Sequence, residues 1–168
     1  FNANGSLAGS QLQVATGALL QYDVSITALS AGRFVISWTQ DESSGLDANL
    51  YGRIYAADGS ASASFRLNGV ASGGSLDYQF ASTLTTLGNR QVVAAWEDTP
   101  RGSGGSSTET RGQIFNVDGT KSGGELLLSL DAVSSGRWLQ EDPTITALKN
   151  GRFVVTYVGL YVTNHTHG

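Results

Sequence analysis

The chain has no cysteine among its 168 residues, only two prolines and few charges, since Asp, Glu, Lys and Arg make up 14 % of it. Without cysteine, neither disulfides nor thiolate metal sites can form, so packing must stabilise the fold. The net charge of −4 offers no basic field to a phosphate backbone or an anionic lipid surface. Apolar runs stay short of the roughly 18 residues that a membrane-spanning helix needs. Neither nucleic acid nor a membrane span is therefore expected.

Glycine, in contrast, is plentiful, with 22 residues, and much of the remaining chain is Ser, Thr, Ala, Val and Leu. This composition favours strands and tight turns over helices. The length is typical of one domain. We therefore expect a single all-β domain.

An internal repeat is the strongest signal in the chain. Three segments share an apolar residue followed by Thr, a Leu before a turn, and an apolar run that ends at an aromatic residue. These segments are residues 26–38, 84–96 and 145–157. Their closing residues, Trp38, Trp96 and Tyr157, lie 58 and 61 residues apart. The repeating unit is therefore about sixty residues long.

A second block follows the first two aromatic residues. Residues 51–59 and 111–119 both end in Asp-Gly, and residues 1–5 match the tail of this block with Asn-Gly. Such pairs suit a tight turn that needs positive φ, so each block predicts a hairpin. The strands expected after the turns are short and apolar: residues 12–14, 65–67 and 126–128.

Each unit is thus expected to hold four short antiparallel strands, in one repeat domain over residues 1–168. The units are approximately 1–20 (a half), 21–72, 73–134 and 135–168 (a half). Because Phe1 lies inside the repeated block, we expect the chain to derive from a longer precursor.

Alternation in the second strand of each unit gives one face of bulky side chains and one of smaller ones. The bulky face comprises Phe34, Ile36, Trp38, Val92, Ala94, Trp96, Phe153, Val155 and Tyr157. The small face comprises Val35, Ser37, Val93, Ala95, Val154 and Thr156. Both faces lack charge, which predicts a strand covered on both sides by other sheets. Gly52 and Gly112, in the third strands, are expected to let a neighbouring sheet approach.

Small four-stranded sheets stacked bulky face on small face describe the blades of a β-propeller, and about three are expected here. Propellers usually have four to eight blades. The alternatives are closure by oligomerisation, membership of a larger propeller in a longer chain, or another stacked-sheet arrangement. The half units favour a ring, because the two ends of the chain could complete one blade.

Three strings, "DPTITALKNGRFVVTY", "NLYGRIYAADGS" and "IFNVDGTKSGGELLL", resemble repeats of large secreted and surface bacterial proteins of the RTX, or haemolysin-type calcium-binding, kind. The resemblance covers nearly the whole chain. It implies an extracellular or cell-surface location and export without cysteine, and it names no ligand. The calcium-binding nonapeptide of that family, Gly-Gly-x-Gly-x-Asp, is missing, since residues 73–77 lack its third glycine.

Acidic residues gather between the expected second and third strands, and they are the candidate metal ligands: Asp41, Glu42, Asp47, Glu97 and Asp98. Ca²⁺ takes six to eight oxygens from carboxylates and carbonyls, so calcium is the one cofactor considered. The alternative is a solvated loop that guards a sheet edge. The absence of a fixed ligand spacing favours this alternative.

Ligand binding is assigned to Trp138, with Arg137 and Glu141 beside it, because this tryptophan lies outside the repeated strand positions in the last loop between units. Trp38 and Trp96 end apolar strands at the repeat spacing and are expected in the core.

No enzyme is predicted, because the chain has no cysteine nucleophile and its two histidines lie in the last four residues. The leading hypothesis is an extracellular bacterial module for adhesion or ligand binding, with a glycan as candidate ligand. The alternatives are a structural protein that assembles into rings or filaments through strand edges, or a calcium-stabilised surface-layer component. The expected partners are further copies of the chain or neighbouring domains of a longer one.

Overall fold

The computed structural model describes residues 1–42, 47–69, 77–88, 90–99, 107–129 and 137–162, with backbone only for residues 77, 137, 138, 161 and 162. Within these residues the regular structure consists of strands and two single 3₁₀ turns, η1 (Ser30–Gly32) and η2 (Lys149–Gly151). The all-β prediction is confirmed. No helix in this part of the chain is long and apolar enough to cross a membrane.

Two complete units and one partial unit follow each other along the chain. The first unit contains β1 (Gln21–Ala28), β2 (Phe34–Asp41), β3 (Asp47–Tyr55) and β4 (Phe65–Arg66). The second contains β5 (Asp77–Leu87), β6 (Gln91–Thr99), β7 (Glu109–Asn116) and β8 (Leu126–Leu127). The third contains β9 (Arg137–Ala147) and β10 (Phe153–Val162). Sequential strands within every unit pair antiparallel, as predicted.

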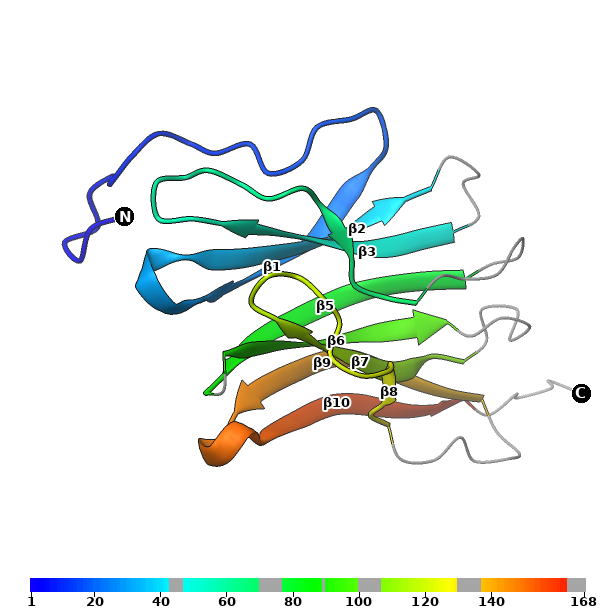
Figure 1. The fold of residues 1–168 in the computed structure, drawn as a ribbon. Coiled ribbons are helices and arrows are strands. Elements are labelled where there is room, and N and C mark those ends of the chain that lie inside the picture. Colours follow the sequence, from blue (N-terminus) through cyan, green and yellow to red (C-terminus); the bar gives the residue numbers. More distant parts are fainter. Residues whose placement is uncertain (43–46, 70–76, 89, 100–106, 130–136, 163–168) are drawn as a thin grey trace, which may run out of the picture.

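The first two units are joined where β3 pairs with β5 in parallel over two residue pairs, Asp47 with Asp77 and Ala48 with Tyr78. The result is one eight-stranded sheet, beside a separate two-stranded sheet of β9 and β10. Because the parallel pairing is so short, the sheets separate into layers away from it. Figure 1 shows these layers stacked in chain order, with β5–β7 between β1–β3 and β9–β10.

The hairpin turns recur with the same hydrogen bonds. Gly5, Gly59 and Gly119 all have positive φ, between 82° and 90°. In each turn the glycine N–H donates to the carbonyl three residues before it. The side chains at Asn4, Asp58 and Asp118 accept a hydrogen bond from the backbone N–H two residues later. The Asn-Gly and Asp-Gly turns are thus confirmed as turns that need glycine.

Bulky-on-small stacking builds two cores. Between the first and second units, Val35 of the small face and its β3 neighbour Ile54 meet Leu84, Val92 and other apolar residues of the next unit. Between the second and third units, Val93 and Ala95 of the small face meet Ile145, with Phe153 and Val155 packed against them. The predicted order of the faces is confirmed at both junctions.

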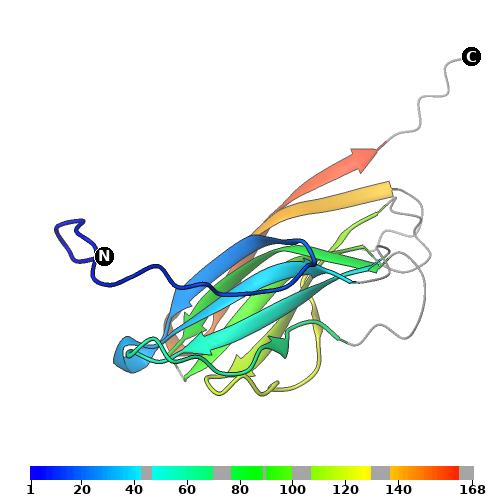
Figure 2. The ribbon, with the colours of Figure 1, turned by 90° about the horizontal axis from the view of Figure 1, so that it is seen from above.

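The bulky face of the first unit has a different cover. Ile36 and Trp38 pack with Tyr55 of β3, and Val14 and Ala15 of the N-terminal segment lie against them. Figures 1 and 2 show this segment running along the outside of the first sheet. Leu12–Val14, expected to be a strand, forms no strand: the Val14 side chain packs on the first sheet and the Val14 carbonyl accepts a hydrogen bond from the Arg53 side chain, not from a strand backbone.

Three further expectations need correction. The strands between turns are longer than predicted, since β2, β6 and β10 continue past Trp38, Trp96 and Tyr157. The small face of β10 is exposed, because no further sheet within the described ranges covers it, whereas that of β6 is buried. Finally, Gly52 and Gly112 do not admit a neighbouring sheet. A Cβ at either position would lie within 2.7 Å of the Leu67 or Leu128 side chain, which comes from the same unit.

Candidate functional site

Each unit's first strand has a bulge at the same repeat position. Asp23, Ala81 and Asp142 have φ of 51° or 52°, and the strand register shifts there in all three units. Residues other than glycine rarely adopt positive φ, so each bulge needs support. The Ala81 N–H donates to Asp23 Oδ2 at 3.0 Å, and the Asp142 N–H donates to Glu97 Oε1 at 2.7 Å. A carboxylate of the preceding unit thus holds each of these two bulges.

Glu97 is the most buried carboxylate of this group, with 3 % of its surface exposed. The pKa of Glu97 is raised to about 7, chiefly by burial; the hydrogen bond from the Asp142 N–H opposes the rise, and the negative charges of Asp142, Glu141 and Asp23 add to it. Near neutral pH this carboxyl is therefore present in both forms. The protonated form can donate a hydrogen bond as well as accept one.

Two tyrosines continue the group at the start of β1 and β5. The Tyr22 hydroxyl donates to Asp41 Oδ1 at 2.9 Å. Burial, then the hydrogen bond to Asp41 and the charges of Asp41 and Asp23, raise the pKa of Tyr22 to about 12, with a smaller effect from Tyr78. Tyr22 therefore keeps its proton at any physiological pH. We call the set joined by these interactions the carboxylate–tyrosine cluster: Tyr22, Asp23, Asp41, Tyr78, Glu97, Glu141 and Asp142.

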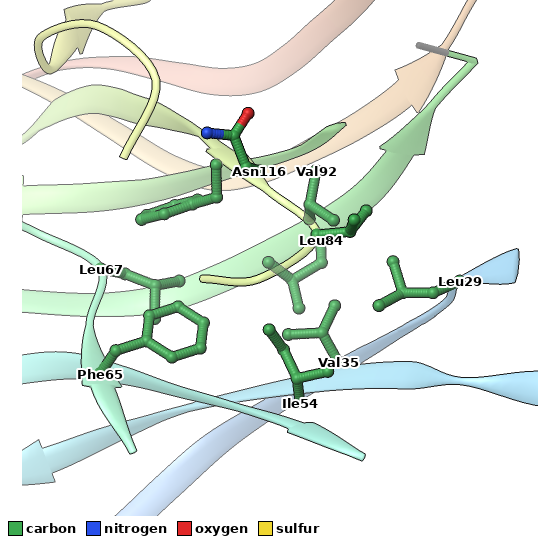
Figure 3. A pocket seen from close by; sticks show the side chains of 10 residues that line it. Leu29, Val35, Ile54, Phe65, Leu67, Leu84, Val92 and Asn116 are labelled. Carbon is green, nitrogen blue, oxygen red and sulfur yellow. The ribbon is translucent and has the colours of Figure 1, made fainter. Parts of the chain in front are cut away.

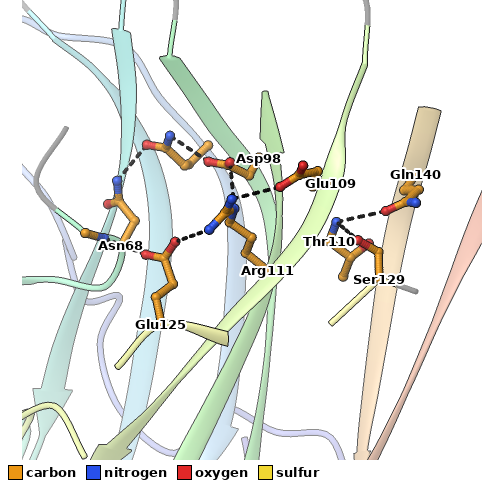
Figure 4. A network of polar contacts seen from close by, with 10 residues as sticks. Asn68, Asp98, Glu109, Thr110, Arg111, Glu125, Ser129 and Gln140 are labelled. Atoms are coloured by element: carbon orange, nitrogen blue, oxygen red, sulfur yellow. Dashed lines mark hydrogen bonds and ion pairs between the residues drawn. The ribbon is translucent and has the colours of Figure 1, made fainter. Parts of the chain in front are cut away.

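A second polar group links the units through their third and fourth strands (Figure 4). The Leu50 N–H donates to Asn68 Oδ1, and Asn68 Nδ2 donates to Gln79 of the next unit. One unit later, the Thr110 N–H is shared between Ser129 Oγ and Gln140 Oε1. In both units, polar side chains thus hold a buried backbone N–H and connect to the first strand of the next unit. This repetition identifies a structural joint between sheets.

Arg111 stands at the centre of the Figure 4 network. Its guanidinium pairs with Asp98 at 2.9 Å, Glu109 at 2.8 Å and Glu125 at 3.3 Å. Burial acts to lower the pKa of Arg111, but the three carboxylates outweigh it and the pKa is raised. The Arg111 guanidinium is therefore held by carboxylates of its own protein, and we assign it a structural role.

The predicted ligand residues lie in a strand and not in a loop. Arg137 and Trp138 are the first residues of β9, where their backbones pair with Val162 and Tyr161, and their side chains lie outside the described residues. Glu141 is half-buried in the same strand, next to the Asp142 bulge. The strand extends this far because β10 also continues past its aromatic residue. Glu141 therefore joins the carboxylate–tyrosine cluster, and the ligand-binding role of all three residues stays a prediction.

The predicted calcium ligands are dispersed over strand ends and strand interiors. Asp41 ends β2 and Asp47 begins β3, while Glu97 and Asp98 lie within β6 and not in the loop after it. Successive residues in a strand point to opposite faces, and Glu97 contacts the Asp142 N–H whereas Asp98 pairs with Arg111. Glu42 accepts hydrogen bonds from Asn49 and Tyr51. No three His, Cys, Asp or Glu residues in the described ranges lie close enough together to hold a metal ion, and calcium stays an untested prediction.

Sequence reasoning missed Asp23, Asp142 and Tyr22. A signal for the two aspartates was present, because each lies three residues before the repeated isoleucine, Ile26 or Ile145. No comparable signal marks Tyr22, whose equivalent in the second unit is Phe80.

The small cavity between the sheets of the first two units is not a site (Figure 3). It measures about 10 Å³, barely room for one water, and apart from Asn116 its lining is apolar, including Leu29, Val35 and Leu84. The ring of Phe65 approaches that of Phe115 at its side, with centroids 5.9 Å apart. We interpret this small cavity as a packing defect of the core.

Comparison with known proteins gives one structural similarity. No family model matches the chain, and no curated protein matches it in sequence. The fold is similar to that of an endo-arabinase from Bacteroides thetaiotaomicron, with a TM-score of 0.53 and 12 % sequence identity over 86 % of this chain. The match spans 57 % of that enzyme's chain, a little over half its length. At this identity the similarity concerns the fold alone.

Proposed function

We propose that this chain is a carbohydrate-binding module whose units are the blades of a propeller-like stack, and that the carboxylate–tyrosine cluster is its binding site. The observation that carries the proposal is the convergence of carboxylates and tyrosines from the first and second strands of successive units. An extracellular adhesion role on a bacterial surface is part of the same proposal and rests on the repeat resemblance.

The chemistry of the cluster suits sugar hydroxyls. Carboxylates accept hydrogen bonds from hydroxyls, and the exposed members of the cluster include the Asp23 and Asp142 carboxylates and the Tyr22 hydroxyl. Tyr22 and Tyr78 add aromatic surface for stacking, and Trp138 is the second residue of β9, the first strand of the third unit. A set of donors, acceptors and rings on neighbouring strands is what specific recognition of a polyhydroxylated ligand requires.

The similarity to an endo-arabinase supports a carbohydrate ligand in preference to other neutral polar ligands. It also brings forward a second candidate function, hydrolysis, because Glu97 has a pKa near 7 and could act as an acid. We favour binding without catalysis, because the Glu97 carboxylate already accepts the Asp142 N–H as a structural partner.

The test is a glycan array that includes arabinan oligosaccharides, followed by calorimetry on any ligand found. Removing the Tyr22 hydroxyl with Tyr22→Phe should weaken binding by about tenfold, the loss of one hydrogen bond to ligand or to Asp41. Tyr51→Phe is the matched control, because the Tyr51 hydroxyl donates to Glu42 at 2.8 Å but lies two strands away on β3. Trp138→Ala tests the predicted ligand residue in the same assay.

No binder on the array, or equal losses for Tyr22→Phe and Tyr51→Phe, would contradict the proposed site. Release of reducing sugar from an oligosaccharide, abolished by Glu97→Gln, would favour the hydrolase over the binding module.

A further inference from the structure

A comparison of equivalent positions in the three units shows how the sheet of one unit covers that of the preceding unit. Positions correspond at a separation of 58 residues between the first and second units and 61 between the second and third. The first strand of a unit lies against the small face of the preceding unit's second strand. Ser82 on β5, for example, meets Ser37 on β2, with 2.9 Å between their hydroxyl oxygens.

On β1 the bulky-face positions lack this cover. Leu84 and Ile145 are 8 % and 6 % exposed, whereas the equivalent Ile26 is 61 % exposed. Val24 is exposed as well, although its equivalents Ser82 and Pro143 are buried. The N-terminal segment covers β2 and β3 of this sheet through Val14 and Ala15. The β1 strip of the bulky face is thus open.

On β10 the small-face positions are uncovered. This is the face against which the first strand of a following unit would pack. Val35 and Val93 are 5 % and 0 % exposed, whereas the equivalent Val154 is 46 % exposed. Thr156 is exposed where Ser37 and Ala95 are buried. Val158, which corresponds to the buried Thr39 and Glu97, presents a further apolar side chain to solvent.

We propose that the open face of β10 (Val154, Thr156 and Val158) docks onto the open β1 strip (Val24 and Ile26) of a second copy of this chain. The contact reproduces the junction that is already made twice within the chain. In that junction the small face of one unit's second strand packs against the bulky-face side chains of the next unit's first strand. Both halves of it are present on every copy, so the second copy is the occupant whose shape and polarity match. Such a head-to-tail interface links copies into a ring or an open stack.

This junction also includes a hydrogen bond. Within the chain, Asp23 Oδ2 accepts the N–H of the next unit's bulge residue, Ala81. Asp142 occupies the position of Asp23 in the third unit and is exposed. In the docked pair, its carboxylate would accept the bulge N–H of Asp23 in the second copy.

The experiment is light scattering and sedimentation velocity on the full chain over about 1 to 100 µM, a range that detects micromolar association. The wild-type mass should rise with concentration. Ile26→Asp, and separately Val154→Asp with Val158→Asp, should each leave a monomer throughout this range. Leu127→Asp is the matched control, since Leu127 is an exposed apolar residue on β8 and on neither open face. Circular dichroism verifies the fold, and Ile26→Ser and Val154→Ser replace any variant that fails this test.

Mixing the two monomeric variants is the decisive arm. Each still presents the face that the other lacks, so the mixture should form a one-to-one dimer that cannot grow further. A wild-type monomer at about 100 µM would overturn the proposal. So would association that survives both sets of substitutions, or a mixture that stays monomeric.

Discussion

The second strand of the middle unit, β6, and that of the last unit, β10, carry the same alternation of side chains but lie in different surroundings. β6 is covered on both faces, and even Glu97 and Asp98 are buried on it. β10 packs against the middle unit through Phe153 and Val155, and its other face meets solvent. Burial of a repeat position therefore depends on the neighbouring unit and not on the unit's own pattern. Paired substitutions at equivalent positions can measure this dependence.

The largest contrast is expected at the closing aromatic residues. Trp96 is fully buried between the first two sheets, whereas its equivalent Tyr157 is only half-buried. Trp96→Ala should lower the free energy of unfolding by about 4 kcal/mol through lost burial and a residual cavity. Tyr157→Ala should cost about half as much or less. Urea denaturation of both variants measures the difference, and equal losses would mean that the last sheet is as well covered as the middle one.

The next contrast concerns pH. Because the pKa of Glu97 in the folded protein is about 7, above its ordinary 4.5, the folded state holds this proton more tightly than the unfolded chain. The wild type should therefore lose stability as pH rises from about 4.5 to about 7, by up to roughly 3 kcal/mol. Glu97→Gln keeps an oxygen for the Asp142 N–H and removes this loss, so it should be the more stable protein at about pH 8.

Val158→Glu extends the comparison between β6 and β10, because it places a carboxyl on the open face of β10 at the position equivalent to Glu97. In the monomer this carboxyl is solvated and should add no pH dependence to the unfolding free energy. Denaturation curves from about pH 5 to about pH 8 for the wild type and both variants test the expectation. A Glu97→Gln variant that follows the wild-type profile would show that another group governs it.

The smallest contrast is expected at two strand glycines. A Cβ on Gly112 would lie 2.7 Å from the Ala94 carbonyl oxygen, whereas a Cβ on Gly159 meets no atom within 4 Å. Gly112→Ala should destabilise the protein by about 1–3 kcal/mol through overpacking. Gly159→Ala should be neutral or slightly stabilising. Thermal unfolding of the two variants separates these outcomes, and a neutral Gly112→Ala would show that β7 can shift away from β6.

The parts of the fold that the sequence predicted are those in which local chemistry decides. The glycines after Asn4, Asp58 and Asp118 require positive φ, and the turns form as expected. The strand alternation also predicted which face stacks on which. The N-terminal segment was beyond such reasoning, because Leu12–Val14 has a strand-like composition but is held by the packed Val14 side chain and by the Arg53 side chain that donates to the Val14 carbonyl.

The candidate site was less accessible from the sequence. Glu97 and Asp98 are adjacent acidic residues, which suggested one solvated loop with shared ligands. The structure places them on opposite faces of β6, one holding the Asp142 bulge and the other pairing with Arg111. Residues 45 positions apart in the chain meet only after the sheets have stacked.

By itself, the sequence determined the sixty-residue repeat, its turns and the order of its faces, because backbone conformation and alternation act within a few residues. Tertiary structure alone decided which copies of the pattern are buried, which carboxylates converge and which faces stay open, because these depend on whether another sheet lies alongside. Ile26, Leu84 and Ile145 illustrate the division, since one repeat position is occupied by similar side chains and yet only the last two are covered.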